Sequence, residues 1–154
     1  MYGSGIKMLL QGDNLTKEQA KRASPVTLAF VGDAVYALYV RERLVKVSAG
    51  KVGDYQRASS KILSARGQSE FLAEIEELFT DEEREIFLRG RNAKKATKSK
   101  NASPAEYNRS TGLEAVVGFL YLTGEMKRVE ELLSAISDEK FQTICQATAF
   151  KPSH

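Results

Sequence analysis

Three features of the sequence predict an all-α protein built as a single helical-bundle domain. A chain of 154 residues, of which 42% are hydrophobic, has the size and composition of one domain with a substantial core. Apolar residues recur at helical spacing or fill whole segments, and signals for helix starts precede these segments. No segment shows the sustained two-residue alternation of strands. We therefore expect a mobile N-terminal segment, residues 1–15, followed by one domain over residues 16–150.

The first two expected helices have clear start signals. Thr16 and Gln19 have the spacing of a capping box, which predicts a short polar helix. Ser24 precedes Pro25, and proline is favoured at the first helical position because its missing N–H would have no partner there. We expect the second helix to extend from Pro25 to Val47.

This second helix carries one acid in an otherwise apolar stretch. Between Val26 and Val40 almost every side is apolar, which predicts burial in the centre of the bundle. A carboxylate removed from water costs several kcal/mol unless it is paired, hydrogen-bonded or bound to a metal. Two interpretations account for this acid, Asp33: it caps a helix that begins near Gly32, or it belongs to a catalytic or metal site.

Residues 51–77 are predicted to form one long amphipathic helix. Its apolar side consists of Tyr55, Ala58, Ile62, Ala65, Leu72 and Ile75. Three basic residues, Arg57, Lys61 and Arg66, lie off this stripe. A solvated helix face explains them more simply than contact with RNA.

Four more helices are predicted in the rest of the chain. Thr80 and Glu83 form a second capping box, for a helix that continues towards Gly90. A further helix begins near Pro104 or at Thr111 and ends at Gly124. Apolar residues spaced from Met126 to Ile136 predict the next helix, and Asp138 is expected to cap a last helix that Pro152 ends.

A second acid lies in another apolar segment. Glu114 is surrounded by apolar and small residues from Thr111 to Leu122. The spacing of Thr111 and Glu114 fits a capping box, which gives this acid a purely structural role. Two apolar helices with one acid each nevertheless match what a divalent cation needs, because Mg²⁺ is commonly held by one or two carboxylates together with waters and phosphates.

Basic residues gather in one segment although the net charge of the chain is only +3. The interval from 86 to 105 holds six of them and no acid, and the part from 91 to 103 is predicted to be a mobile loop. The six are Arg89, Arg91, Lys94, Lys95, Lys98 and Lys100. Such a segment either aids solubility or contacts phosphate groups.

Several classes of protein are excluded by composition. One cysteine, Cys145, leaves no internal disulfide and no multi-cysteine zinc site, which favours a reducing cytoplasm. The only histidine is the last residue, His154, so a Ser-His or Cys-His mechanism has no base. The first ten residues do not read as a signal peptide, and charges interrupt the longest apolar run, so we expect no membrane partner.

Two motifs in order resemble a known family. The first is Phe30-Val31-Gly32-Asp33-Ala34-Val35, and the second runs from Leu113 through Glu114 to Leu122. Together they resemble the pair of signature helices of the ribonuclease III family. With the basic run Arg89-Gly90-Arg91-Asn92-Ala93-Lys94 between them, the chain is similar to the short form of that family, Mini-ribonuclease III. The resemblance covers residues 25–133.

The resemblance implies a function for each of these features. It implies a double-strand-specific endoribonuclease that hydrolyses phosphodiester bonds and leaves 5′-phosphate ends, acting in the subgroup on the precursor of large-subunit (23S) ribosomal RNA. Asp33 and Glu114 match its essential carboxylates, which hold Mg²⁺, with Mn²⁺ able to substitute. Phe30 matches a residue at the interface of a homodimer. The basic residues, Arg89, Arg91, Lys94, Lys95, Lys98 and Lys100, are expected to bind double-stranded RNA.

Two departures from the family pattern keep other functions open. The family has a glutamate where this chain has Ala29 and an aspartate where it has Thr111, so a cluster of four carboxylates is reduced to two. A non-catalytic RNA-binding or ribosome-associated module on the same fold is the main alternative. An unrelated helical interaction domain is another, and it predicts that Asp33 and Glu114 lie far apart.

Overall fold

The all-α prediction is confirmed by a computed structural model, which describes residues 12–94 and 103–146 and, of residues 145 and 146, the backbone alone. Within these ranges the chain forms α-helices, one short 3₁₀ helix and no strand. None of the helices in the described ranges has the length and apolar character needed to cross a membrane. The elements are α1 (Lys17–Arg22), α2 (Pro25–Val47), α3 (Val52–Leu63), α4 (Ala65–Ile75), η1 (Glu76–Leu78), α5 (Asp81–Asn92), α6 (Pro104–Leu122), α7 (Met126–Leu133) and α8 (Asp138–Gln146).

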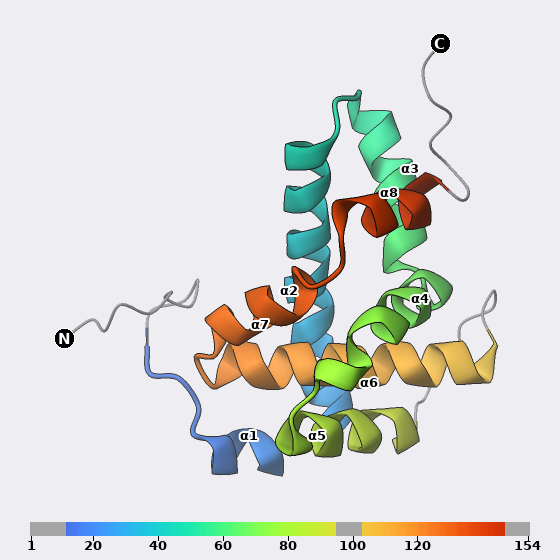
Figure 1. Cartoon of the computed structure of the whole chain (residues 1–154). Helices are drawn as coiled ribbons and strands as arrows, with labels where there is room; N and C mark the ends of the chain where they lie inside the picture. The colour runs from blue at the N-terminus through green and yellow to red at the C-terminus, as the bar shows by residue number, and fades with distance from the viewer. Residues whose placement is uncertain (1–11, 95–102, 147–154) are drawn as a thin grey trace.

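Helix α6 is the centre of the bundle. It lies across α2, with α5 alongside it and with α4 packed against it as well (Figure 1). Three of its apolar residues, Leu113, Val116 and Phe119, are at most 1% exposed, as a helix that is apolar on nearly all sides requires. Tyr36 of α2 meets Phe71 of α4 edge to face, with ring centroids 5.5 Å apart, which joins a third helix to the same core.

Glycines allow α2 and α6 to touch backbone to backbone. A Cβ atom on Gly32 would lie 1.7 Å from the carbonyl oxygen of Glu114, and one on Gly118 would lie 1.9 Å from that of Leu28. No side chain fits in either space, so the crossing depends on glycine at both positions. Because the crossing places Gly32 on the Glu114 carbonyl, it fixes the position of the neighbouring Asp33 relative to Glu114.

Helix starts in the structure decide between the two interpretations of each acid. Helix α2 begins at Pro25, where the Ser24 hydroxyl accepts the Thr27 N–H at 3.1 Å, so Asp33 lies inside the helix. Helix α6 begins at Pro104 with a Ser103 cap, so Glu114 also lies well inside its helix. The capping interpretation is therefore wrong for both acids.

The prediction of one long helix over residues 51–77 is wrong. The helix is interrupted at Ser64, whose backbone is extended. The Ser64 hydroxyl accepts the Gly67 N–H at 3.0 Å and so caps α4. A Cβ atom on Gly67 would lie 2.2 Å from the Lys61 carbonyl oxygen, so the two helices turn tightly here. The apolar residues keep helical spacing across the break, which is why the pattern alone concealed it.

The expected cap of the last helix is also wrong, by one residue. Ser137 rather than Asp138 caps α8, because the Ser137 hydroxyl accepts the Lys140 N–H at 3.1 Å. The Asp138 carboxylate instead accepts a hydrogen bond of 2.8 Å from Arg43, a residue of α2. This contact joins the N-terminal end of α8 to the C-terminal part of α2.

Helix α2 is less buried than its sequence predicts. One face carries three large apolar side chains with high exposed fractions: Phe30 at 81%, Leu38 at 54% and Val45 at 63%. Asp33 is exposed as well, contrary to the expected burial of this acid. The helix therefore packs into the core along one side and presents an apolar stripe and a carboxylate on another.

Candidate active site

The crossing of α2 and α6 brings the two predicted acids together. Gly32, the residue before Asp33, contacts the backbone of Glu114, and the two carboxyl groups lie within hydrogen-bonding reach of each other. The interpretation of the chain as an unrelated helical domain required these acids to be far apart, and that interpretation is wrong. Asp33 is exposed and Glu114 is mostly buried, so the pair is open to solvent from one side.

The surroundings of Glu114 oppose its negative charge. Burial, together with the hydrogen bond and the negative charge of Asp33, raises the pKa of its carboxyl group to about 9. A hydrogen bond from Gln68 lowers the pKa of Glu114 but does not outweigh these effects. A cation bound between two adjacent carboxyl groups of this kind would favour the ionised form of Glu114.

Gln68 is a site residue that the sequence pattern did not reveal. Its side chain is buried, with 3% exposed, and its Nε2 atom donates to the Leu63 carbonyl at 3.0 Å and lies 3.5 Å from Oε2 of Glu114. The signal in the sequence is weak: Gln68 precedes Phe71 and Leu72 by one helical turn, which places a polar residue on the buried side of α4.

The residues present fit a cation that keeps part of its hydration shell. Asp33 and Glu114 supply two carboxylates, and the described residues contain no group of three or more His, Cys, Asp or Glu side chains around a common point. The positions where the resembling family has its other two acids, Ala29 and Thr111, are both 6% exposed, and the Thr111 hydroxyl donates to the Tyr107 carbonyl. Two carboxylates suit Mg²⁺, which leaves its remaining positions to waters and phosphate oxygens.

Part of the predicted basic segment lies beside this site. A Cβ atom on Gly90 would lie 3.0 Å from the Cβ of Ala115, so the end of α5 packs next to Glu114. Arg89 and Arg91 flank Gly90, and α5 extends to Asn92 rather than ending before Arg91 as the sequence suggested. Lys94 follows and is exposed. The other predicted RNA-binding residues, Lys95, Lys98 and Lys100, lie outside the described residues, as does most of the predicted loop.

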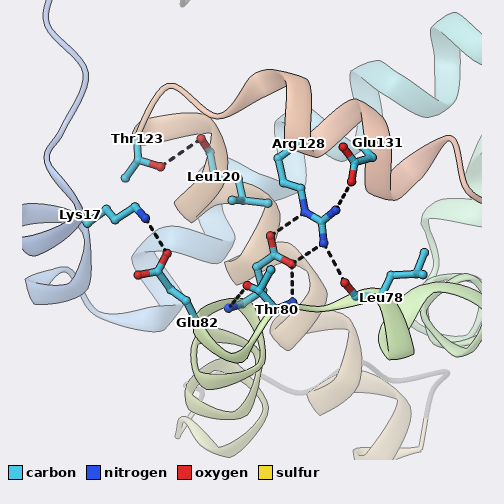
Figure 2. Close-up of polar contacts among 9 residues, drawn as sticks. Lys17, Leu78, Thr80, Glu82, Leu120, Thr123, Arg128 and Glu131 are labelled. Atoms are coloured by element: carbon cyan, nitrogen blue, oxygen red, sulfur yellow. Dashed lines mark hydrogen bonds and ion pairs between the residues drawn. The ribbon is translucent and has the colours of Figure 1, made fainter.

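A second buried glutamate lies away from this site and is fully paired. Glu83 has a side-chain exposure of 4%, and Arg128 of α7 donates to its two carboxylate oxygens at 2.8 and 2.9 Å. Figure 2 shows Arg128 with the Leu78 carbonyl and Glu131 around it. Burial raises the pKa of Glu83, but the hydrogen bonds from Arg128 and Thr80 outweigh burial and lower it. The sequence predicted the capping role of Glu83 and missed Arg128, whose partner is distant in the chain.

Comparisons with known proteins agree with this geometry. The Ribonuclease III domain family matches residues 26–125, which include both acids. The chain is 44% identical over 126 residues to Mini-ribonuclease 3 of Staphylococcus aureus, covering 80% of this chain and 94% of the relative. It is 43% identical over 114 residues to Mini-ribonuclease 3 of Symbiobacterium thermophilum, covering 74% and 88%. A crystal structure of a Fusobacterium nucleatum protein is similar, with a TM-score of 0.66, 25% identity and coverage of 73% and 90%.

The chain belongs to the ribonuclease III family. Its helical fold, its acid pair at the crossing of two signature helices and the family match over residues 26–125 all support this assignment. The curated relatives named above are Mini-ribonucleases 3, and the chain spans most of the length of each. The resemblance that the two sequence motifs suggested is therefore confirmed.

Proposed function

We propose that Asp33 and Glu114 hold the divalent cation with which this double-strand-specific endoribonuclease hydrolyses phosphodiester bonds. The observation that carries the proposal is the pairing of two carboxyl groups, one of them mostly buried. Among the described residues, no lysine or arginine forms an ion pair with either carboxyl group. Mg²⁺ suits this pair, and Mn²⁺ can substitute for it. A cation bound there would lower the pKa of an attacking water and neutralise charge on the phosphate.

The basic residues at the end of α5 support the binding of RNA beside this pair. Arg89, Arg91 and Lys94 lie where α5 packs against α6 near Glu114, and Lys95, Lys98 and Lys100 follow in sequence. Contacts from lysine and arginine to phosphates supply most of the affinity that does not depend on sequence. A-form RNA exposes its backbone and 2′-hydroxyls, so these residues would recognise duplex shape more than base sequence.

A homodimer would place two such sites opposite each other. Phe30 is 81% exposed on α2, and Leu38 and Val45 extend the same apolar stripe. A large exposed aromatic residue among aliphatic ones is typical of an interface. Two-fold symmetry around this stripe would present one acid pair to each strand of an RNA duplex.

The cellular substrate we propose is the precursor of large-subunit (23S) ribosomal RNA, processed in the cytoplasm. The support is the resemblance of the chain to the short form of the family, which implies this substrate. A non-catalytic RNA-binding or ribosome-associated role is the competing proposal, because Ala29 and Thr111 stand where the family has two further acids.

Cleavage of a double-stranded RNA in Mg²⁺ or Mn²⁺ tests the catalytic proposal. Native protein is compared with Asp33→Asn and Glu114→Gln, and with Glu139→Gln on an exposed face of α8 as the control. We expect each site variant to lose cleavage by roughly 10³-fold, because metal-dependent charge stabilisation amounts to several kcal/mol. Binding of RNA without cleavage by the native protein would contradict catalysis and support the RNA-binding module.

Sedimentation of native protein and of Phe30→Ala tests the dimer. We expect the variant to dissociate at concentrations where native protein is dimeric, because an exposed aromatic anchor carries much of the energy of an interface. Val52→Ala is the matched control, since Val52 is 72% exposed on α3. A native monomer, or equal dissociation of both variants, would contradict the role of Phe30.

A further inference from the structure

The amide of Gln68 is buried beside the acid pair and is only partly satisfied. Its Nε2 atom donates to the Leu63 carbonyl at 3.0 Å and lies 3.5 Å from Oε2 of Glu114. Its Oε1 atom is buried and has no hydrogen-bond partner. Both neighbours of Nε2 are acceptors, so the donor end of the amide must face them and Oε1 must face away.

A packing role alone does not explain this side chain. A buried acceptor without a partner lowers the stability of the folded chain, a cost that an apolar residue of the same size would avoid. Gln68 is 3% exposed and follows the tight turn between α3 and α4, where methionine or leucine would fill the same volume. The chain retains an amide at a position where stability favours a hydrocarbon.

The surroundings hold Gln68 in a fixed place relative to Glu114. Ser64 caps α4, and Gly67 lies so close to the Lys61 carbonyl that the turn has little freedom. Arg109 of α6 donates to the Ser69 hydroxyl at 3.2 Å and so joins α4 to the helix that carries Glu114. Gln68 therefore lies on a turn of little freedom that is joined directly to α6, the helix that carries Glu114.

We propose that Gln68 is a positioning residue for Glu114: its Nε2 atom, held by the Leu63 carbonyl, orients the carboxylate towards Asp33. This inference rests on the proposed cation site of Asp33 and Glu114. Residues that orient ligands affect metal affinity or activity about 10–100-fold. With two carboxylates instead of four, the orientation of each one has more influence on the affinity of the site.

Titration of the RNA-free protein with Mn²⁺, followed by electron paramagnetic resonance, tests the proposal without measuring activity. Gln68→Met keeps the volume and removes both polar atoms. We expect its dissociation constant for Mn²⁺ to rise about tenfold or more and kcat for RNA cleavage to fall by a similar factor. Its Tm should be equal to or higher than that of the native protein, because the unsatisfied acceptor is gone. Gln142→Met, on an exposed part of α8, should match native protein in all three measurements.

A second variant keeps the test decisive if Gln68→Met folds poorly. Gln68→Asn retains the amide but is one methylene shorter, so it cannot reach both Leu63 and Glu114, and we expect the same loss of Mn²⁺ affinity. Native Mn²⁺ affinity and native kcat in either folded variant would overturn the proposal. If the native protein itself neither binds Mn²⁺ nor cleaves RNA, the proposed function fails as well. If it does both and the variants equal it, only the role of Gln68 fails.

Discussion

Glu83 is buried and Glu114 is mostly buried in the same bundle. Their surroundings shift the pKa values of the two carboxyl groups in opposite directions. Arg128 and Thr80 donate to Glu83, and the pKa of its carboxyl group is lowered despite burial. Glu114 is buried next to Asp33, and its pKa is raised to about 9. An acid buried with a basic partner joins elements of the fold, whereas an acid buried beside another acid is held protonated unless a cation binds. The difference marks the Asp33 and Glu114 pair, and not Glu83, as the candidate functional site.

The kind of contact that holds the helices together also differs between the two regions. The Glu83 region is held by side chains: Arg128 also donates to the Leu78 carbonyl at 2.8 Å and pairs with Glu131 (Figure 2). The Glu114 region is held by backbone contact through Gly32 and Gly118. Substitutions can remove the side-chain contacts one at a time, whereas the backbone contact leaves no space for an added atom.

Substitution of Gly118 by alanine should have the largest effect on the fold. The new Cβ would lie 1.9 Å from the Leu28 carbonyl, so α2 and α6 must separate. We expect a loss of at least about 3 kcal/mol of unfolding free energy, the upper end for overpacking, together with loss of RNA cleavage. Gly53→Ala is the matched control, because its Cβ would meet only the flexible end of Arg57 at 3.4 Å. Equal stability of the two variants in urea unfolding would contradict the backbone crossing.

Substitution of Arg128 by methionine should reduce stability and spare catalysis. The substitution leaves the buried Glu83 carboxylate without its basic partner. We expect the unfolding free energy to fall by about 2 kcal/mol, less than for a fully buried pair, because 21% of the Arg128 side chain is exposed to solvent. Cleavage measured well below the lowered Tm should remain near the native rate. Arg22→Met, which breaks an exposed pair with Glu18, should change stability by less than about 0.5 kcal/mol. A loss of cleavage by the folded Arg128 variant would contradict the separation of the two regions.

A gradual effect is expected from pH on the stability of the metal-free protein. The pKa of Glu114 rises from its ordinary value of 4.5 to about 9 on folding, so between these values the folded chain keeps a proton that the unfolded chain has released. Raising the pH through this range therefore favours unfolding, by at most about 1.4 kcal/mol per pH unit. Glu114→Gln should remove this decline in thermal unfolding measured with EDTA. Parallel pH profiles for the variant and the native protein would show that Glu114 is not held protonated.

Much of the fold could be predicted from local signals, and the failures have local causes too. Capping boxes at Thr16 and Thr80 and the proline start of α2 are observed as predicted. The break at Ser64 was missed because a serine cap inside a continuous apolar stripe leaves the helical spacing intact. The exposed face of α2 was missed because Phe30 and Leu38 look like core residues in sequence.

The site was predictable only in part. The pairing of Asp33 with Glu114 followed from two motifs that resemble a known family, since no spacing rule brings together residues so far apart in the chain. Gln68 and Arg128 were missed because their significance lies in contacts between α4 and α6 and between α5 and α7. Contacts of this kind depend on the angles at which helices cross, which composition and periodicity do not determine.

Proton release on binding of Mg²⁺ tests most directly whether the acid pair is the cation site. Isothermal titration calorimetry at pH 7.5, in two buffers of different ionisation enthalpy, gives the number of protons released per Mg²⁺ bound. Because metal ligands must be deprotonated, the raised pKa of Glu114 predicts release of about one proton per chain. Glu114→Gln should bind Mg²⁺ weakly and release none, while Glu83→Gln should release as much as the native protein. Native binding without proton release, or undiminished release by Glu114→Gln, would contradict the account.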